Sequence, residues 1–134
     1  MNTNPDQLVT PSHEIPVGIE DLHRARSLLA GKEDFLPGRR AAVALRTPLV
    51  LSDPLTRQLG CNVWLKLENL QKTGSYKVRG AFNNIANLDP DQRNRGIVTA
   101  SAGNHAQGVA YSASLFGIAE QTVIFVPIGT PRVK

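Results

Sequence analysis

The 134-residue sequence predicts an α/β fold, namely a partial three-layer αβα arrangement with a mainly parallel sheet. Apolar residues recur at helical spacing in some segments and at strand spacing in others. Between residues 97 and 126, a strand, a polar loop, a helix and a second strand follow one another, which is the order of a βαβ unit. With 41% hydrophobic and 19% charged residues, the composition is typical of one ordinary globular domain.

The first half of the chain predicts one long helix and several short elements. Residues 1–14 are polar and predict a disordered tail, so that the ordered domain spans residues 15–134. A helix is expected over 19–30, because its apolar side chains fall on one face and Gly31 suits its end. The further elements expected are an extended segment at 49–51, a short helix over 54–59 and a strand over 63–67.

The second half predicts alternating helices and strands. The turn Thr73–Ser75 offers a capping hydroxyl for a helix over about 76–87, and Asp89 with Pro90 predicts the start of a short helix that ends before Gly96. A buried strand at 97–100, a helix over 105–116 and a strand at 122–126 follow. Thr130 and Pro131 have the pattern of a further helix start, which indicates a piece of a longer protein.

The charge pattern favours an anionic ligand and excludes several classes of protein. Residues 1–38 hold 3 basic and 6 acidic residues, whereas residues 39–134 hold 12 and 5. The basic residues are scattered, which argues against nucleic acid as a partner. A single cysteine forms no internal disulfide, and the three histidines match no zinc spacing. No apolar run is long enough for a membrane span or a signal peptide, so a cytoplasmic location is expected.

Lys77 is the first residue that the sequence marks for chemistry. It lies in the segment TGSYKVRG, residues 73–80, at the start of a predicted helix, where the helix dipole disfavours a positive charge. Such a lysine is suited to forming an imine with an aldehyde, because its amine must lose a proton before it attacks. From spacing alone, the more common alternative is a surface lysine beside a core stripe.

A second candidate site is the segment SAGNHAQG, residues 101–108, between a predicted strand and a predicted helix. Ser101, Gly103 and Asn104 combine a hydroxyl, a side-chain amide and the free N–H groups of a helix start, which suits a carboxylate or phosphate. The alternatives are an ordinary strand-to-helix turn and, for His105, a structural histidine. The segment lacks the Lys-Ser/Thr of a phosphate loop, and the chain has no G-x-S-x-G elbow.

Two long segments of the chain resemble a known family. The segments LENLQKTGSYKVRGA, residues 67–81, and SAGNHAQG together resemble the pyridoxal-phosphate enzymes of the tryptophan-synthase-β-like fold, known as fold type II. They are most similar to the threonine/serine dehydratases, and Arg46–Leu49 and Thr130–Pro131 resemble the same family. The resemblance covers about residues 15–134 and implies a lyase that converts threonine or serine to a 2-oxo acid and ammonia.

The resemblance also implies a role for each site residue. Lys77 would bind the cofactor, pyridoxal 5′-phosphate, through an imine and later act as the base on the substrate α-proton. Asn104 would hydrogen-bond the ring hydroxyl oxygen of the cofactor, and Tyr76 would contact the cofactor where most members have phenylalanine. The residues around the substrate carboxylate would be Ser101, Gly103, Asn104 and His105. No metal ion is implied.

The resemblance further implies that this chain is incomplete. In the family, the glycine-rich phosphate-binding loop and the group that faces the pyridine nitrogen follow later in the sequence. We therefore expect residues 15–134 to form an incomplete catalytic domain that is inactive alone, from a parent enzyme that is a homo-oligomer acting on a small amino acid. The alternatives are a serine racemase-like or other hydroxyamino-acid enzyme, and a non-catalytic βαβ binding module.

Overall fold

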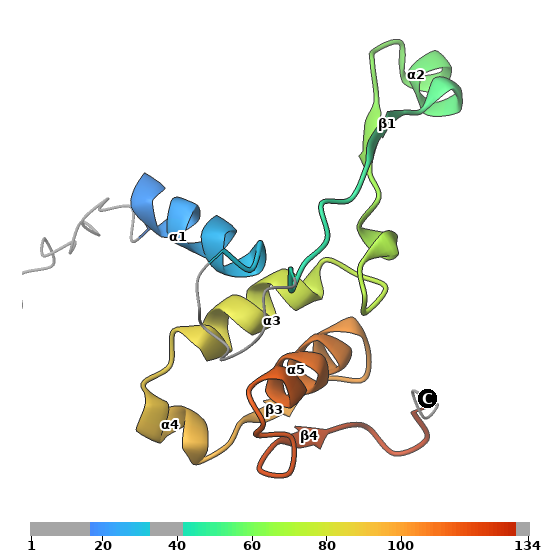
Figure 1. Ribbon diagram of the computed structural model, residues 1–134. Helices are drawn as coiled ribbons and strands as arrows, with labels where there is room; N and C mark the ends of the chain where they lie inside the picture. The colour runs from blue at the N-terminus through green and yellow to red at the C-terminus, as the bar shows by residue number, and fades with distance from the viewer. Residues whose placement is uncertain (1–16, 33–41, 131–134) are drawn as a thin grey trace, which may run out of the picture.

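The computed structural model describes residues 17–32 and 42–130 (Figure 1). The predicted tail at 1–14 and the predicted helical residue Pro131 lie outside these residues. The elements of the described chain are, in order, α1 (Ile19–Leu29), β1 (Leu49–Leu51), α2 (Asp53–Leu59), β2 (Trp64–Lys66), the 3-10 helix η1 (Glu68–Leu70), α3 (Lys77–Ala86), α4 (Pro90–Asn94), β3 (Val98–Ala100), α5 (Asn104–Leu115) and β4 (Val123–Phe125). Every predicted helix and strand within the described residues is present, with ends that differ by at most one residue.

Helix α3 lies at the centre of the packing, between α1 and α5 (Figure 1). One face of α3 joins a buried cluster of Leu28, Val43, Ala44, Val78, Phe82 and Ala86. The other face joins a second cluster of Ala81, Ile85, Val109, Ala113 and Ile118. The rings of Phe82 and Phe116 stack with their centroids 5.2 Å apart, and this contact links the two clusters. The apolar stripes that predicted these helices are therefore the surfaces by which they pack.

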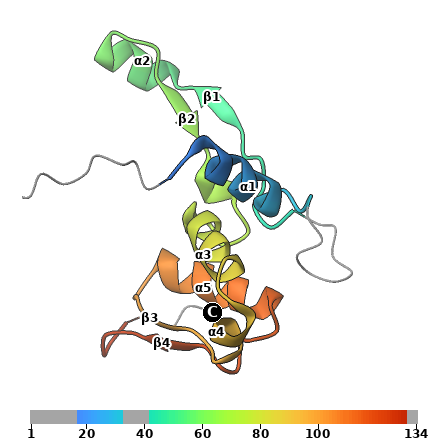
Figure 2. The same ribbon diagram turned by 90° about the vertical axis from the view of Figure 1, so that its left-hand side faces the viewer.

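The four strands form two separate pairs in the described chain. β1 and β2 are antiparallel, and Val50 lies opposite Leu65. β3 and β4 are parallel, and Thr99 lies opposite Ile124, which confirms the βαβ unit predicted from the sequence. Figure 2 shows α5 on one side of the parallel pair, whereas β1, β2 and α2 form an arm that stands away from α3 and α5.

The prediction that residues 97–100 form a buried strand was wrong about burial. Val98 is 70% exposed and Phe125 on the neighbouring strand is 61% exposed. Thr99 and Ile124, which share the opposite face of the pair, are partly buried. Because side chains alternate along a strand, a helix on one side of the sheet covers only every second residue. Helix α5 packs against β3, whereas Val98 and Phe125 on the other face of the pair stay exposed.

Candidate active site

Lys77 is the first residue of α3, as the sequence predicts. Its side chain is half-buried, and its Nζ lies 5.2 Å from the centre of the Tyr76 ring, which is 58% exposed. The expected N-cap was wrong, because Tyr76 occupies the cap position and makes no side-chain capping bond. Ser75 lies one residue too early, although its hydroxyl accepts a hydrogen bond from the Lys77 N–H at 3.3 Å. The lysine thus begins the helix next to an aromatic ring.

The turn before Lys77 is held by a carboxylate that the sequence analysis missed. Glu68 in η1 forms a bidentate ion pair with Arg79 in α3, at 2.8 Å from Nε and 2.9 Å from Nη2. The Thr47 hydroxyl donates to the same carboxylate at 2.6 Å. These bonds, that of Arg79 first, lower the pKa of Glu68 to about 2. Glu68 therefore ties the segment 68–79 into a closed turn that carries Lys77.

Gln71 connects this turn to the extended segment before β1. Its side-chain amide donates to the Leu45 carbonyl and accepts from the Leu45 N–H, both at 2.8 Å. Arg79 donates to the same Leu45 carbonyl at 3.0 Å, and Lys72 Nζ donates to the Ala42 carbonyl at 2.7 Å. Gly74 closes the turn with φ of +69°, a backbone conformation that residues other than glycine rarely adopt. Side chains of the turn thus fix it to backbone groups that lie about 30 residues earlier in the sequence.

The predicted anion-binding turn forms the start of α5. Ser101 Oγ accepts from the N–H groups of Gly103 and Ala106, each at 3.3 Å, and the Ser101 N–H donates to the Phe125 carbonyl at 2.9 Å. Gly103 is the N-cap, Asn104 is exposed and His105 is half-buried. Within residues 17–32 and 42–130, the N–H groups of Asn104 and His105 have no hydrogen-bond acceptor. The turn therefore presents free donors at the positive end of a helix dipole.

The two motifs meet where α5 lies against the start of α3. Figures 1 and 2 both show α3 and α5 side by side. An ideal Cβ on Gly108 would lie 3.1 Å from the Lys77 carbonyl carbon and oxygen. The backbones of Lys77 and Gly108 are therefore in close contact, although about 30 residues separate them in the sequence. The amine of Lys77 is at the start of α3, and the two free N–H donors are at the start of α5. The reaction class inferred from the sequence requires both an amine and such donors.

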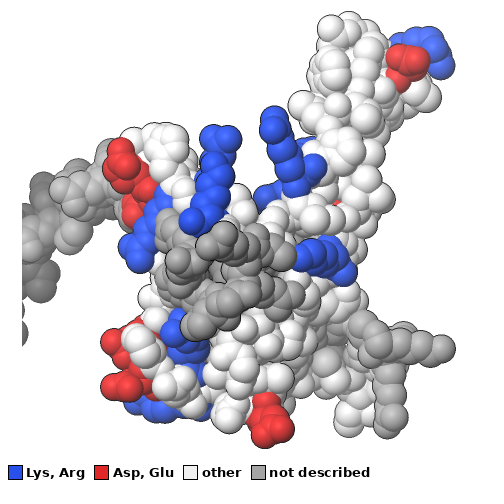
Figure 3. All heavy atoms as spheres, viewed as in Figure 1, with Lys and Arg blue, Asp and Glu red and all other residues white. Residues whose placement is uncertain are grey.

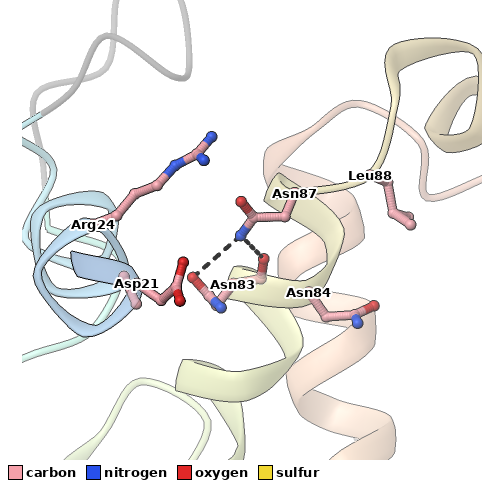
Figure 4. A pocket seen from close by; sticks show the side chains of 7 residues that line it. Asp21, Arg24, Asn83, Asn84, Asn87 and Leu88 are labelled. Atoms are coloured by element: carbon pink, nitrogen blue, oxygen red, sulfur yellow. Dashed lines mark hydrogen bonds between the residues drawn. The ribbon is translucent and has the colours of Figure 1, made fainter. Parts of the chain in front are cut away.

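Two cavities of the described chain lie away from these residues. One, of about 340 Å³, lies between α1 and α3 and is lined by Asp21, Arg24 and three asparagines (Figure 4). Asn87 Nδ2 donates to the Asn83 carbonyl there at 2.7 Å. The other, of about 890 Å³, lies between α1 and the segment 44–46, where basic side chains gather (Figure 3). None of the predicted site residues lines either cavity.

The part of the chain that the structure describes has neither a group of three metal-ligating side chains nor a membrane-spanning helix. No three histidine, cysteine, aspartate or glutamate side chains there are grouped closely enough to hold a metal ion. No helix among residues 17–32 and 42–130 is both long and apolar enough to span a bilayer.

Comparison with known proteins identifies the family. Residues 17–134 match the family model described as "Pyridoxal-phosphate dependent enzyme". The chain belongs to this family. An L-threonine ammonia-lyase of Thermotoga maritima is 55% identical over 88 residues, which are 64% of this chain and 22% of that protein. The resemblance seen in the sequence is thus confirmed.

Solved structures of the family share the fold. Processed threonine deaminase isoform 2 from Solanum lycopersicum is 36% identical with a TM-score of 0.62, over 86% of this chain and 29% of that one. Serine racemase from Dictyostelium discoideum is 31% identical with a TM-score of 0.68, over 86% and 34%. The α/β fold of the fold type II enzymes is confirmed. The chain spans between about a fifth and a third of the length of these relatives.

The residues present fit the cofactor of this family, pyridoxal phosphate. The aldehyde of that molecule requires a primary amine, and Lys77 offers one at the start of α3. Its hydroxyl oxygen and the acid group of an amino acid require hydrogen-bond donors, and the α5 start offers two free N–H groups beside the Asn104 amide. The donor set and the amine therefore suit the cofactor and an amino acid together.

Proposed function

We propose that this chain carries the lysine-bearing part of a pyridoxal-phosphate-dependent ammonia-lyase that acts on threonine or serine. The observation that supports the proposal is the close approach of Gly108 on α5 to the backbone of Lys77 on α3, because the free N–H donors begin the same helix four residues earlier. The 55% identity to an L-threonine ammonia-lyase supports threonine as a substrate. Because the chain spans a fraction of its relatives, the whole reaction is proposed for the parent enzyme.

In this proposal the roles of the residues follow from their positions. Lys77 would hold the cofactor through its ε-amine and accept the α-proton of the substrate at the same Nζ. Tyr76 would lie beside the cofactor, and Asn104 would donate to its ring hydroxyl oxygen. The substrate carboxylate would take the N–H donors of the α5 start, with Ser101, Gly103 and His105 around it. Bound pyridoxal phosphate supplies the electron sink for the charge that develops at the substrate α-carbon.

The balance of the reaction is the loss of water followed by hydrolysis. The α-proton leaves to Lys77 Nζ, and the β-hydroxyl group departs as water once it gains a proton. The released aminoacrylic acid or aminocrotonic acid takes up water and yields a 2-oxo acid and ammonia. No oxidant or metal is required for this sequence of steps.

Reductive labelling tests the proposal directly. The chain is mixed with pyridoxal phosphate, reduced with borohydride, digested and mapped by mass spectrometry. We expect the label at Lys77, none above background in Lys77→Arg, and an unchanged Lys77 label in the control Lys32→Arg, since Lys32 is exposed. An even label over all lysines would refute retained cofactor chemistry and would favour a non-catalytic βαβ binding module.

A serine racemase is the second candidate, supported by the fold similarity to the Dictyostelium enzyme. The two candidates differ in the substrates that displace Lys77 from the cofactor. Addition of an amino acid before borohydride lowers the Lys77 label when that amino acid takes the place of the lysine. L-threonine and L-serine are expected to lower the label in an ammonia-lyase, whereas equal effects of L-serine and D-serine would favour the racemase.

A further inference from the structure

Gly108 is buried where α5 crosses the first turn of α3. A Cβ at this position would lie 3.1 Å from the Lys77 carbonyl carbon and oxygen and 3.3 Å from the Val78 nitrogen. All three atoms belong to the backbone, so they cannot move aside by a change of rotamer. Ordinary van der Waals contact between carbon atoms begins near 3.5 Å, so a side chain at residue 108 requires that one helix shifts.

Gly108 lies inside a helix, although glycine has a low helix propensity. A glycine inside a helix costs about 1 kcal/mol relative to alanine, which makes a glycine without a packing role unfavourable. Four residues further along the same face, Ser112 is fully buried, and its Oγ donates to the Gly108 carbonyl at 2.7 Å. The Ser112 hydroxyl thus bonds to a carbonyl of its own helix, and no long side chain projects from α5 at residues 108 and 112. Close approach of the two backbones explains both small residues.

This approach links the two parts of the proposed site. Lys77 begins α3, and the free N–H groups of Asn104 and His105 begin α5, four and three residues before Gly108. Because a helix moves as a rigid element, a shift of α5 at Gly108 also moves the donors at its start. The contact between Gly108 and Lys77 therefore sets the separation between the backbone that carries the amine and the donors at the α5 start.

We propose that Gly108 is a positioning residue, which holds Lys77 at the correct separation from the donors at the α5 start. This inference rests on the proposed function and deepens it. In enzymes, a misplacement of about 1 Å can cost about a hundredfold in rate. Because contacts of 3.1–3.3 Å require a shift of a few tenths of an ångström, a side chain at residue 108 is expected to slow imine formation at Lys77 by about threefold to tenfold, even where the chain remains folded.

The test compares three variants of the full chain. Gly108→Ala places a Cβ against Lys77. Gly80→Ala is the matched control, because Gly80 is also a helical glycine but a Cβ there meets no described atom within 4 Å. Ser112→Ala removes the buried hydrogen bond in the same interface without adding bulk. For each variant, the rate of borohydride-trapped labelling at Lys77 and the free energy of unfolding in urea are measured.

We expect a loss of Lys77 labelling in Gly108→Ala alone, with labelling in Gly80→Ala and Ser112→Ala within about twofold of wild type. A purely structural role predicts instead that labelling follows the free energy of unfolding, so that Ser112→Ala loses as much as Gly108→Ala at equal destabilisation. That result would overturn the proposal, and so would a Gly108→Ala variant that labels Lys77 like wild type. In the second case the proposed function stands.

A measurement without cofactor keeps the two proposals separate. In proton NMR spectra of the wild-type chain, the Gly108 α-protons should show a strong cross-relaxation peak to the Val78 amide proton. The amide signals of Lys77 and Asn104 should shift in Gly108→Ala and stay in place in Gly80→Ala. If the wild-type chain fails to label Lys77 selectively, the proposed function fails and these spectra decide the positioning role. If Gly108→Ala does not fold, the test is the wild-type peak between the Gly108 α-protons and the Val78 amide proton. Absence of that peak overturns the inference.

Discussion

Glu68 should make the stability of the chain depend on pH in the acidic range. Its carboxylate accepts hydrogen bonds from Arg79 and Thr47, and these lower its pKa from 4.5 to about 2. A group whose pKa is lower in the folded chain contributes stability above its unfolded value. That contribution is complete above about pH 4.5 and is lost as the pH falls toward about 2.

The size of the effect follows from the same contacts. A fall of the pKa from 4.5 to about 2 corresponds to about 3 kcal/mol if the carboxylate were fully shielded from solvent. The Arg79 side chain is 34% exposed and that of Glu68 is 17% exposed, so solvent screens part of the attraction. We therefore expect about 1–2 kcal/mol of folding free energy from this carboxylate at neutral pH.

The assay is urea unfolding followed by circular dichroism at several pH values between 7 and 2. Wild type should lose about 1–2 kcal/mol more than Glu68→Gln between about pH 4.5 and 2, because the variant has no charge to lose at this position. Glu120→Gln is the control, since Glu120 is exposed. The difference between variants separates Glu68 from the other carboxylates that titrate in this range. Equal slopes for wild type and Glu68→Gln would refute the reasoning.

Three further substitutions test the packing that supports the site. Gly96→Ala should cost more than about 2 kcal/mol in urea unfolding, because Gly96 has φ of +95° and a Cβ would overlap the Gln121 carbonyl; a smaller loss would contradict this geometry. Phe82→Ala should cost about 3–5 kcal/mol in the same assay, since Phe82 is 1% exposed within the first buried cluster. Asp89→Ala should cost about 1 kcal/mol by thermal unfolding, because the carboxylate caps α4 through the Asp91 N–H at 2.8 Å, and an unchanged transition would exclude a capping role.

The elements of the fold were predictable from local patterns. The stripe that predicted α3 consists of Val78, Ala81, Phe82 and Ile85, and all four are buried. Asp89 and Pro90 predicted the start of α4, which has a complete capping box. These signals are local, because residues a few positions apart determine a helix face and a helix cap. Burial of β3 was predicted wrongly, since the strand sequence does not say how many neighbours cover it.

The supports of Lys77 were not predictable in the same way. Glu68 lies 11 residues before Arg79 and 21 after Thr47, and no local spacing relates the three. The segment LENLQKTGSYKVRGA contains the ion pair, yet its residues alone do not distinguish a solvated charge from a closed turn. The Glu68 carboxylate also accepts a hydrogen bond from the Gln71 side-chain amide at 3.2 Å. A carboxylate that accepts from a hydroxyl, an amide and a guanidinium exists only once the turn is folded against the segment before β1. Long-range contacts of this kind are seen only in the folded structure.

Two glycines show the limit of reading the site from sequence. Gly80 and Gly108 both interrupt helical segments, and both carry the same propensity cost of about 1 kcal/mol relative to alanine. In the structure, a Cβ at Gly80 meets no described atom within 4 Å, whereas one at Gly108 would press on the Lys77 backbone. The residue types that perform chemistry are visible along the chain, because Lys77 and Asn104 carry their amine and amide in their own side chains. The proposed positioning role of Gly108 is recognised only in the structure, where the space beside it is too small for a methyl group.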